Sequence, residues 1–81
     1  MQKSISSTKQ QQFLKLLKTT RESAGLRQQD IANSLKQPQS FVSKYESGER
    51  RLDLLELEQV CEACGTDLLA FTRRYLKESA L

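Results

Sequence analysis

The sequence predicts an all-α protein that forms a single small domain. Apolar residues recur at helical spacing along almost the whole chain of 81 residues, a length typical of one domain. No stretch of useful length alternates apolar and polar residues as a half-buried β-strand does. The single proline and the three glycines fall between the periodic stretches and divide the chain into five expected helices. We expect the domain to span residues 8–77, between a flexible N-terminal arm of residues 1–7 and a tail of residues 78–81.

The first helix is expected to begin near Thr8, because Ser7 and Gln10 have the spacing of a capping box. The apolar residues expected to share one stripe of this helix are Phe13, Leu17 and Ala24. Gly25 is expected to end the helix, since glycine readily adopts the left-handed backbone conformation that closes a helix.

The second and third helices are expected at about residues 28–35 and 39–47. Pro38 separates them, because the residue before a proline is pushed out of the helical region. Gly48 ends the third helix. A short helix, a three-residue break and another short helix are the outline of a helix-turn-helix.

The fourth helix is expected to open with a capping box formed by Asp53 and Glu56, and to run to about residue 64. The fifth is expected to follow a cap at Thr66 or Asp67 and to run to about residue 77. No internal repeat or linker interrupts this series of helices.

The sequence lacks the side chains that most enzymes and metal sites need. It has no histidine, the commonest general base and metal ligand. Its two cysteines, Cys61 and Cys64, are too few for a four-cysteine zinc site, and inside a predicted helix they are expected to be buried free thiols. The glycines stand too far apart for a phosphate-binding loop. We therefore expect a binding protein that is not an enzyme and that uses no metal or cofactor.

The charge is unevenly divided along the chain. Residues 1–51 hold ten Lys and Arg against four Asp and Glu, a net charge of +6, whereas residues 52–81 carry a net charge of −3. A basic lobe of this size is typical of proteins that bind a polyanion such as DNA. On charge alone, the alternative that these cations only solvate helix faces stays open.

Neither export nor membrane insertion is expected. No apolar run approaches the roughly 18 residues of a membrane span. Residues 1–8 lack the apolar core of a signal peptide. We therefore expect a cytoplasmic protein that does not contact a membrane.

The third expected helix has one apolar and one polar face. On a helical wheel Val42 and Tyr45 point one way. The residues on the opposite face are Gln39, Ser40, Ser43, Lys44 and Ser47. Such a face suits the reading of DNA bases, because Gln pairs with adenine, Lys with guanine and Ser with either. The alternative is an ordinary solvated face, on which acids would normally be mixed with the bases.

Two segments carry a resemblance to a known family. Residues 21–32 read RESAGLRQQDIA, and residues 38–51 read PQSFVSKYESGERR. They resemble the opening of the helix-turn-helix, and the recognition helix with its following loop, of the phage-repressor family (Cro and lambda-repressor type, XRE). The likeness extends over about residues 13–71 and implies a five-helix, lambda-repressor-like fold.

The resemblance implies a sequence-specific DNA-binding transcriptional regulator, of repressor type, whose recognition helix at about residues 39–47 lies in the major groove. Two modules would reach successive major grooves about 34 Å apart, so we expect a homodimer on a palindromic operator in double-stranded DNA. An alternative function is that of an antitoxin-like protein, which mainly binds a partner toxin and uses DNA binding for autoregulation. A restriction-modification controller or a prophage regulator also fits the resemblance. A protein partner is possible, either a toxin or another regulator, and the sequence does not identify it.

The resemblance also implies roles for individual residues. The positions that match base contacts, or lie close to the DNA, are Gln39, Ser40, Ser43 and Lys44. The positions expected to contact phosphates are Arg27, Gln28, Arg50 and Arg51. Arg21 and Glu46 match a pair that forms an internal salt bridge between the first and third helices in this family.

Three residues depart from the family pattern or leave a choice. Lys36 stands where the family usually has glycine, so a left-handed conformation there would cost about 1 kcal/mol, or the turn differs. Arg27 replaces the usual Ser or Thr cap, which forfeits about 1 kcal/mol but adds a cation near the phosphates. Phe41 either packs at the edge of the core or touches a thymine methyl, and we favour packing.

The last helix offers a surface for dimerisation. Leu68, Phe71 and Tyr75 form one apolar stripe, and Leu69 and Leu76 extend it by about another 100°. Exposed apolar area of this kind usually marks an interface. The expected interface residues are Leu69, Phe71, Tyr75 and Leu76. The cations that would pair with acidic residues of the second copy across the interface are Arg73, Arg74 and Lys77. The alternative is a broad amphipathic helix on a monomer.

Overall fold

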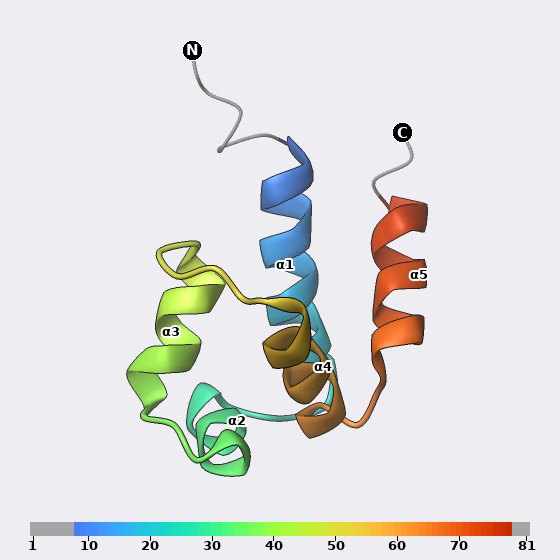
Figure 1. Cartoon of the computed structure of the whole chain (residues 1–81). Coiled ribbons are helices and arrows are strands. Elements are labelled where there is room, and N and C mark those ends of the chain that lie inside the picture. The colour runs from blue at the N-terminus through green and yellow to red at the C-terminus, as the bar shows by residue number, and fades with distance from the viewer. Residues whose placement is uncertain (1–7, 79–81) are drawn as a thin grey trace.

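The computed structural model describes residues 8–78, which form five α-helices and contain no strand (Figure 1). The helices are α1 Thr8–Ser23, α2 Gln28–Leu35, α3 Gln39–Ser47, α4 Leu54–Ala63 and α5 Leu68–Glu78. The predicted all-α class and the order of the five helices are confirmed. The expected arm of residues 1–7, with the cap at Ser7, lies outside the described residues. Glu78 belongs to α5 rather than to a tail, and the rest of that expected tail, residues 79–81, also lies outside them.

The helix-turn-helix and the last helix lie on opposite sides of the molecule. In Figure 1 α3 is on the left and α5 on the right, with α1 and α4 between them. α5 packs against α1 and α4, and α3 packs against α2 and α1. The outward face of α5 is therefore turned away from the helix expected to read DNA.

One core joins the five helices. The buried apolar residues are Leu16, Leu17, Ile31, Ala32, Val42, Tyr45, Val60, Cys61, Cys64 and Phe71. The predicted stripe of α1 is wrong at Ala24, which lies in the turn after the helix and is exposed, while Leu16 is buried instead. Each large side chain buried in such a core contributes roughly 1.5–3 kcal/mol. This core fixes the positions of α2 and α3 on the body of the domain.

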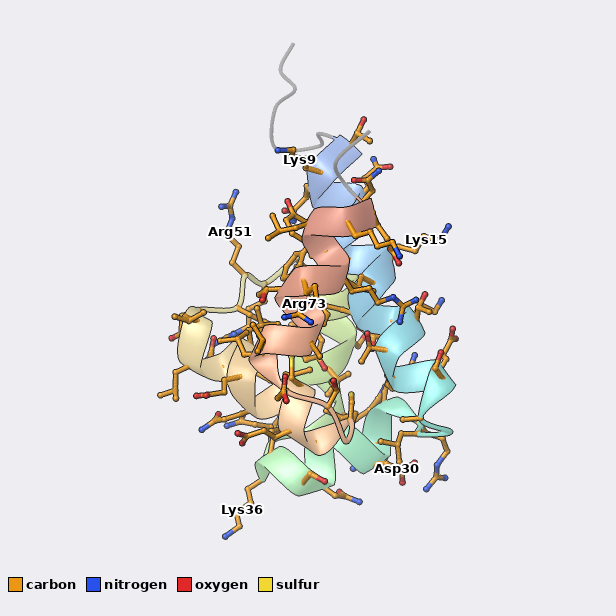
Figure 2. The ribbon with its side chains drawn as sticks, turned by 90° about the vertical axis from the view of Figure 1, so that its right-hand side faces the viewer. Lys9, Lys15, Asp30, Lys36, Arg51 and Arg73 are labelled. Carbon is orange, nitrogen blue, oxygen red and sulfur yellow. The ribbon has the colours of Figure 1, made fainter. Side chains whose placement is uncertain are left out.

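The turn between α2 and α3 contains a strained residue. Lys36 has φ 57° and ψ 44°, in the left-handed region that favours glycine. The N–H of Gln37 donates to the carbonyl of Ala32 at 2.9 Å, which completes a Schellman-type helix end. Of the two predicted alternatives, the left-handed turn with a lysine in the place of glycine is therefore the one present. The side chain of Lys36 extends outward from this turn (Figure 2).

Gly48 ends α3 in the same conformation, with φ 86°. The backbone conformation favours glycine, and a Cβ atom at this position would lie 3.0 Å from Cδ1 of Leu14, so the Leu14 side chain would have to shift. The N–H of Glu49 then donates to the carbonyl of Lys44 at 2.9 Å, which turns the chain into the loop before α4. Within residues 8–78, no helix is both long and apolar enough to cross a membrane.

Candidate nucleic-acid interface

The two faces of α3 diverge as the sequence predicts. Val42 and Tyr45 are 0% and 1% exposed and belong to the core. The side chains on the opposite, exposed face are Gln39, Ser40, Ser43, Lys44 and Ser47. α3 therefore presents amides, hydroxyls and one cation to solvent, and no acid lies among them.

Arg21 on α1 and Glu46 on α3 form an ion pair inside the protein. Nε of Arg21 donates to Oε2 of Glu46 at 2.7 Å, and Nη2 donates to Oε1 at 3.1 Å. Nη1 also donates to the carbonyl of Leu26 at 2.9 Å. The two side chains are 10% and 5% exposed. The structure thus brings together the pair that the family resemblance implies, and this pair joins the first helix to the third.

The same carboxylate begins a chain of hydrogen bonds that reaches the exposed face of α3. Nε2 of Gln28 donates to Oε1 of Glu46 at 3.0 Å, and Nε2 of Gln39 donates to Oε1 of Gln28 at 2.6 Å. Gln39 keeps its carbonyl oxygen and one N–H for another partner. That acceptor and donor pair is what the major-groove edge of adenine requires. Sequence reasoning missed the contact between Gln28 and Gln39, because it depends on how two helices meet.

Arg27 precedes α2 and supplies no side-chain cap, as expected. Asp30 compensates in part, because its Oδ2 accepts the backbone N–H of Arg27 at 2.8 Å. The same carboxylate pairs with the guanidinium, with Nη2 of Arg27 at 3.0 Å from Oδ1. This pairing holds the pKa of Asp30 below its usual range. The side chain of Arg27 is 79% exposed and remains beside the start of α2.

The two arginines after α3 have different surroundings. Arg50 is turned toward the protein, where its guanidinium pairs with Glu56 and its central carbon lies 4.7 Å from the ring centre of Phe41. Phe41 is half-buried and contacts Tyr45 edge to face, with ring centres 5.5 Å apart. Of the two predicted alternatives for Phe41, packing therefore holds. Arg51 extends away from the body of the protein (Figure 2).

The expected interface residues on α5 divide into two groups. Phe71 is 4% exposed and its ring centre lies 6.0 Å from that of Phe13, which is also 6.2 Å from the ring of Tyr75. The rings of Phe71 and Tyr75 both pack against Phe13 of the same chain. The prediction that Phe71 is available as an interface side chain is therefore wrong. Leu69 and Leu76 are 67% and 65% exposed.

Sequence reasoning missed two further exposed leucines. Leu54 and Leu55, in the first turn of α4, are 68% and 63% exposed. They follow the capping box at Asp53, so the sequence predicts their position at the start of a helix. It does not predict their exposure, which depends on how α4 packs against the other helices. Among residues 8–78, these two leucines together with Leu69 and Leu76 are the large apolar side chains that are mostly exposed.

Comparisons with known proteins agree with this arrangement. The helix-turn-helix domain family matches residues 12–71. An XRE-family like protein from Pseudomonas syringae pv. tomato str. DC3000 has a similar structure, with 41% identity over 88% of this chain and 87% of that one, and a TM-score of 0.81. A tyrosine-to-phenylalanine mutant of the Restriction-Modification Controller Protein C.Esp1396I shares the fold at 24% identity, over 89% of this chain and 91% of that one, with a TM-score of 0.78. No protein among the curated sequences matches this chain. The chain therefore belongs to the XRE family of helix-turn-helix DNA-binding regulators.

Proposed function

We propose that this protein is a sequence-specific transcriptional repressor that binds a palindromic operator in double-stranded DNA as a homodimer. The observation that carries the proposal is the exposed, acid-free face of α3, on which the side chain of Gln39 is fixed by a hydrogen bond to Gln28. α3 would enter the major groove, and a dimer covering two successive grooves would exclude other proteins from the operator.

Base reading is assigned to four residues of α3. Gln39 would accept from and donate to adenine, because its bond to Gln28 fixes the amide before DNA arrives and so lowers the entropy lost on binding. Lys44 would donate to guanine. Ser40 and Ser43, both exposed, would hydrogen-bond to either kind of base edge.

Phosphate contacts are assigned to the residues that flank the helix-turn-helix. Gln28 opens α2, where the free backbone N–H groups of the helix favour an anion. Arg27 and Arg51 are exposed cations at the start of α2 and in the loop after α3. Such contacts set the register of the protein on DNA without reading sequence. Arg50 receives a different role in the next subsection, since its guanidinium is engaged within the protein.

Dimerisation is assigned to the outward face of α5. Leu69 and Leu76 lie close together on a helical wheel with Arg73 beside them, and Arg73 points away from the body of the protein (Figure 2). Because this face lies opposite α3 (Figure 1), a second copy bound there leaves both α3 helices on the outside of the dimer. Arg74 is already paired with Glu78 in its own helix at 2.9 Å. Arg73 and Lys77 are thus the cations left to meet acids of the second copy.

Selection from a random pool of DNA duplexes tests the function directly. We expect the enriched sequences to contain two inverted half-sites with centres about one helical turn apart. The oligomeric state of the free protein and of its DNA complex should be measured in the same buffer. Enrichment of no sequence, or of a single half-site by a monomer, would contradict the proposal.

A further inference from the structure

Arg50 connects three parts of the protein around the proposed DNA-binding surface. Its guanidinium donates to both carboxylate oxygens of Glu56, from Nη1 to Oε1 at 3.1 Å and from Nη2 to Oε2 at 2.8 Å. Nη1 also donates to the backbone carbonyl of Arg51 at 3.1 Å, and the guanidinium lies over the ring of Phe41. Arg50 thus links α3, through Phe41, to the first turn of α4, through Glu56, and holds the peptide of Arg51 between them.

Glu56 is itself fixed by the start of α4. Its Oε1 accepts the backbone N–H of Asp53 at 3.0 Å, and Oδ1 of Asp53 accepts the backbone N–H of Glu56 at 2.7 Å. This capping box leaves the carboxylate little freedom to follow Arg50 elsewhere. The hydrogen bonds from Arg50 and from the Asp53 backbone lower the pKa of Glu56, so its carboxylate is charged at neutral pH.

The loop that carries Arg51 depends on this fixed point. The backbone N–H groups of Gly48, Glu49 and Arg50 donate back to the last turn of α3. Arg51 and Leu52 belong to no helix or strand. The bond from Arg50 fixes the carbonyl of Arg51, and thereby the direction in which the Arg51 side chain leaves the loop. Without the carboxylate of Glu56, the guanidinium of Arg50 would lose two of its three hydrogen bonds and swing free of that carbonyl.

We propose that Glu56 is a positioning residue for DNA binding: through Arg50 it holds the loop of residues 48–53 so that Arg51 meets a phosphate. The inference rests on the DNA binding proposed above. Simple electrostatics predicts the opposite effect, because an acid near a DNA-binding surface repels phosphates and its removal should tighten binding. Whether removal of the Glu56 charge weakens or tightens DNA binding therefore distinguishes the positioning effect from the electrostatic effect.

Glu56→Gln isolates the positioning effect. Glutamine retains an oxygen that accepts the N–H of Asp53, which preserves the capping box, but it cannot form the charged fork with Arg50. Glu49→Gln is the matched control, since it removes the same charge from the loop that Glu56 is proposed to hold. Among residues 8–78 the carboxylate of Glu49 takes part in no ion pair.

The affinities are to be measured by fluorescence anisotropy on the selected operator and on an unrelated duplex, at several salt concentrations, with the melting temperature of each variant. We expect Glu56→Gln to bind both duplexes about tenfold more weakly than the wild type, because Arg51 no longer meets its phosphate. The slope of log affinity against log salt should fall in magnitude by about one, as for the loss of one phosphate contact. Glu49→Gln should bind slightly more tightly.

Arg50→Lys provides a second test, because lysine keeps the charge but cannot form the fork. We expect it to weaken binding as Glu56→Gln does. A folded Glu56→Gln variant that binds as tightly as Glu49→Gln, or an Arg50→Lys variant with wild-type affinity, would overturn the inference. A wild-type protein that binds neither duplex would overturn the proposed function instead, and that result is visible before any variant is made.

Discussion

Arg21 and Glu46 form a buried ion pair that ties the proposed recognition helix to the first helix of the domain. Each charge is compensated: Arg21 donates to both oxygens of Glu46 and to the carbonyl of Leu26, and Glu46 also accepts from Gln28. A buried pair with its hydrogen bonds satisfied costs little to keep, but the loss of one partner leaves an isolated charge. We therefore expect the pair to act on the position of α3 rather than on DNA directly.

The first prediction is that Arg21→Ala destabilises the fold by about 3–5 kcal/mol, and by less if water reaches Glu46. A small domain has a total stability of about 5–15 kcal/mol, so the variant should melt at a much lower temperature or fail to fold. Arg21→Met combined with Glu46→Met is the control, because replacing both charges by apolar groups should recover most of the loss. An unchanged melting temperature with weakened DNA affinity would show that Arg21 contacts DNA.

The second prediction concerns the turn between α2 and α3. Lys36→Gly should stabilise the protein by about 0.5–1 kcal/mol, because Lys36 adopts a left-handed conformation that glycine accepts without strain. The melting temperature should rise by about 4–8 °C for each kcal/mol in a domain of this size. Lys36→Ala is the control: it removes the same charge but keeps the Cβ atom, so it should not stabilise. Equal gains for alanine and glycine would show that charge, not backbone strain, is responsible.

The elements of this fold could be predicted because their signals are local. Glycine at 48, proline at 38 and the capping box of Asp53 with Glu56 each act over a few residues, so the sequence alone places the helix ends. The missed contacts join side chains far apart in the chain. Arg50 and Arg51 are neighbours with the same charge. Only the positions of Glu56 on α4 and of Phe41 show that the guanidinium of Arg50 is engaged within the protein. The exposure of Leu69 beside the buried Phe71 similarly depends on how α5 lies on α1.

The third prediction separates base reading from phosphate binding. Lys44→Ala should cost about 1–3 kcal/mol on the selected operator and relax the preference at one base pair, with little change on unrelated DNA. Arg51→Ala is the contrasting variant, and should weaken binding on all sequences and reduce the salt dependence. Binding measured on operator variants with single base-pair changes gives both quantities. If Lys44→Ala kept full sequence preference, α3 would not be reading the bases through this side chain.

The fourth prediction concerns Cys61, a free thiol that is 1% exposed. Burial raises its pKa to about 11, so only about one thiol in a thousand is ionised at pH 8. Labelling of the folded protein by a thiol reagent should be slow at pH 8 and fast in denaturant. Because the folded pKa lies above the unfolded value, the thiol's contribution to stability is complete below about pH 9 and is lost as the pH rises toward 11. Cys61→Ala should show a smaller loss, because burial also raises the pKa of Cys64 and of Tyr45, which still contribute. Rapid labelling of Cys61 in the native protein would contradict the prediction.

The fifth prediction is that the outward face of α5 joins two copies of the chain. Leu69 and Leu76 are about two-thirds exposed in the single chain, and burying them against a second copy removes apolar surface from water. Sedimentation equilibrium at micromolar concentration should give about twice the chain mass of 9.3 kDa. Leu69→Glu combined with Leu76→Glu should give a folded monomer, because four carboxylates would meet across the two-fold axis. Ser23→Glu combined with Ala24→Glu adds the same charge at exposed positions of another helix end, and should leave the dimer intact. A monomeric wild-type protein would show that the chain does not self-associate. A dimer that survives both leucine substitutions would show that the two copies meet through another surface.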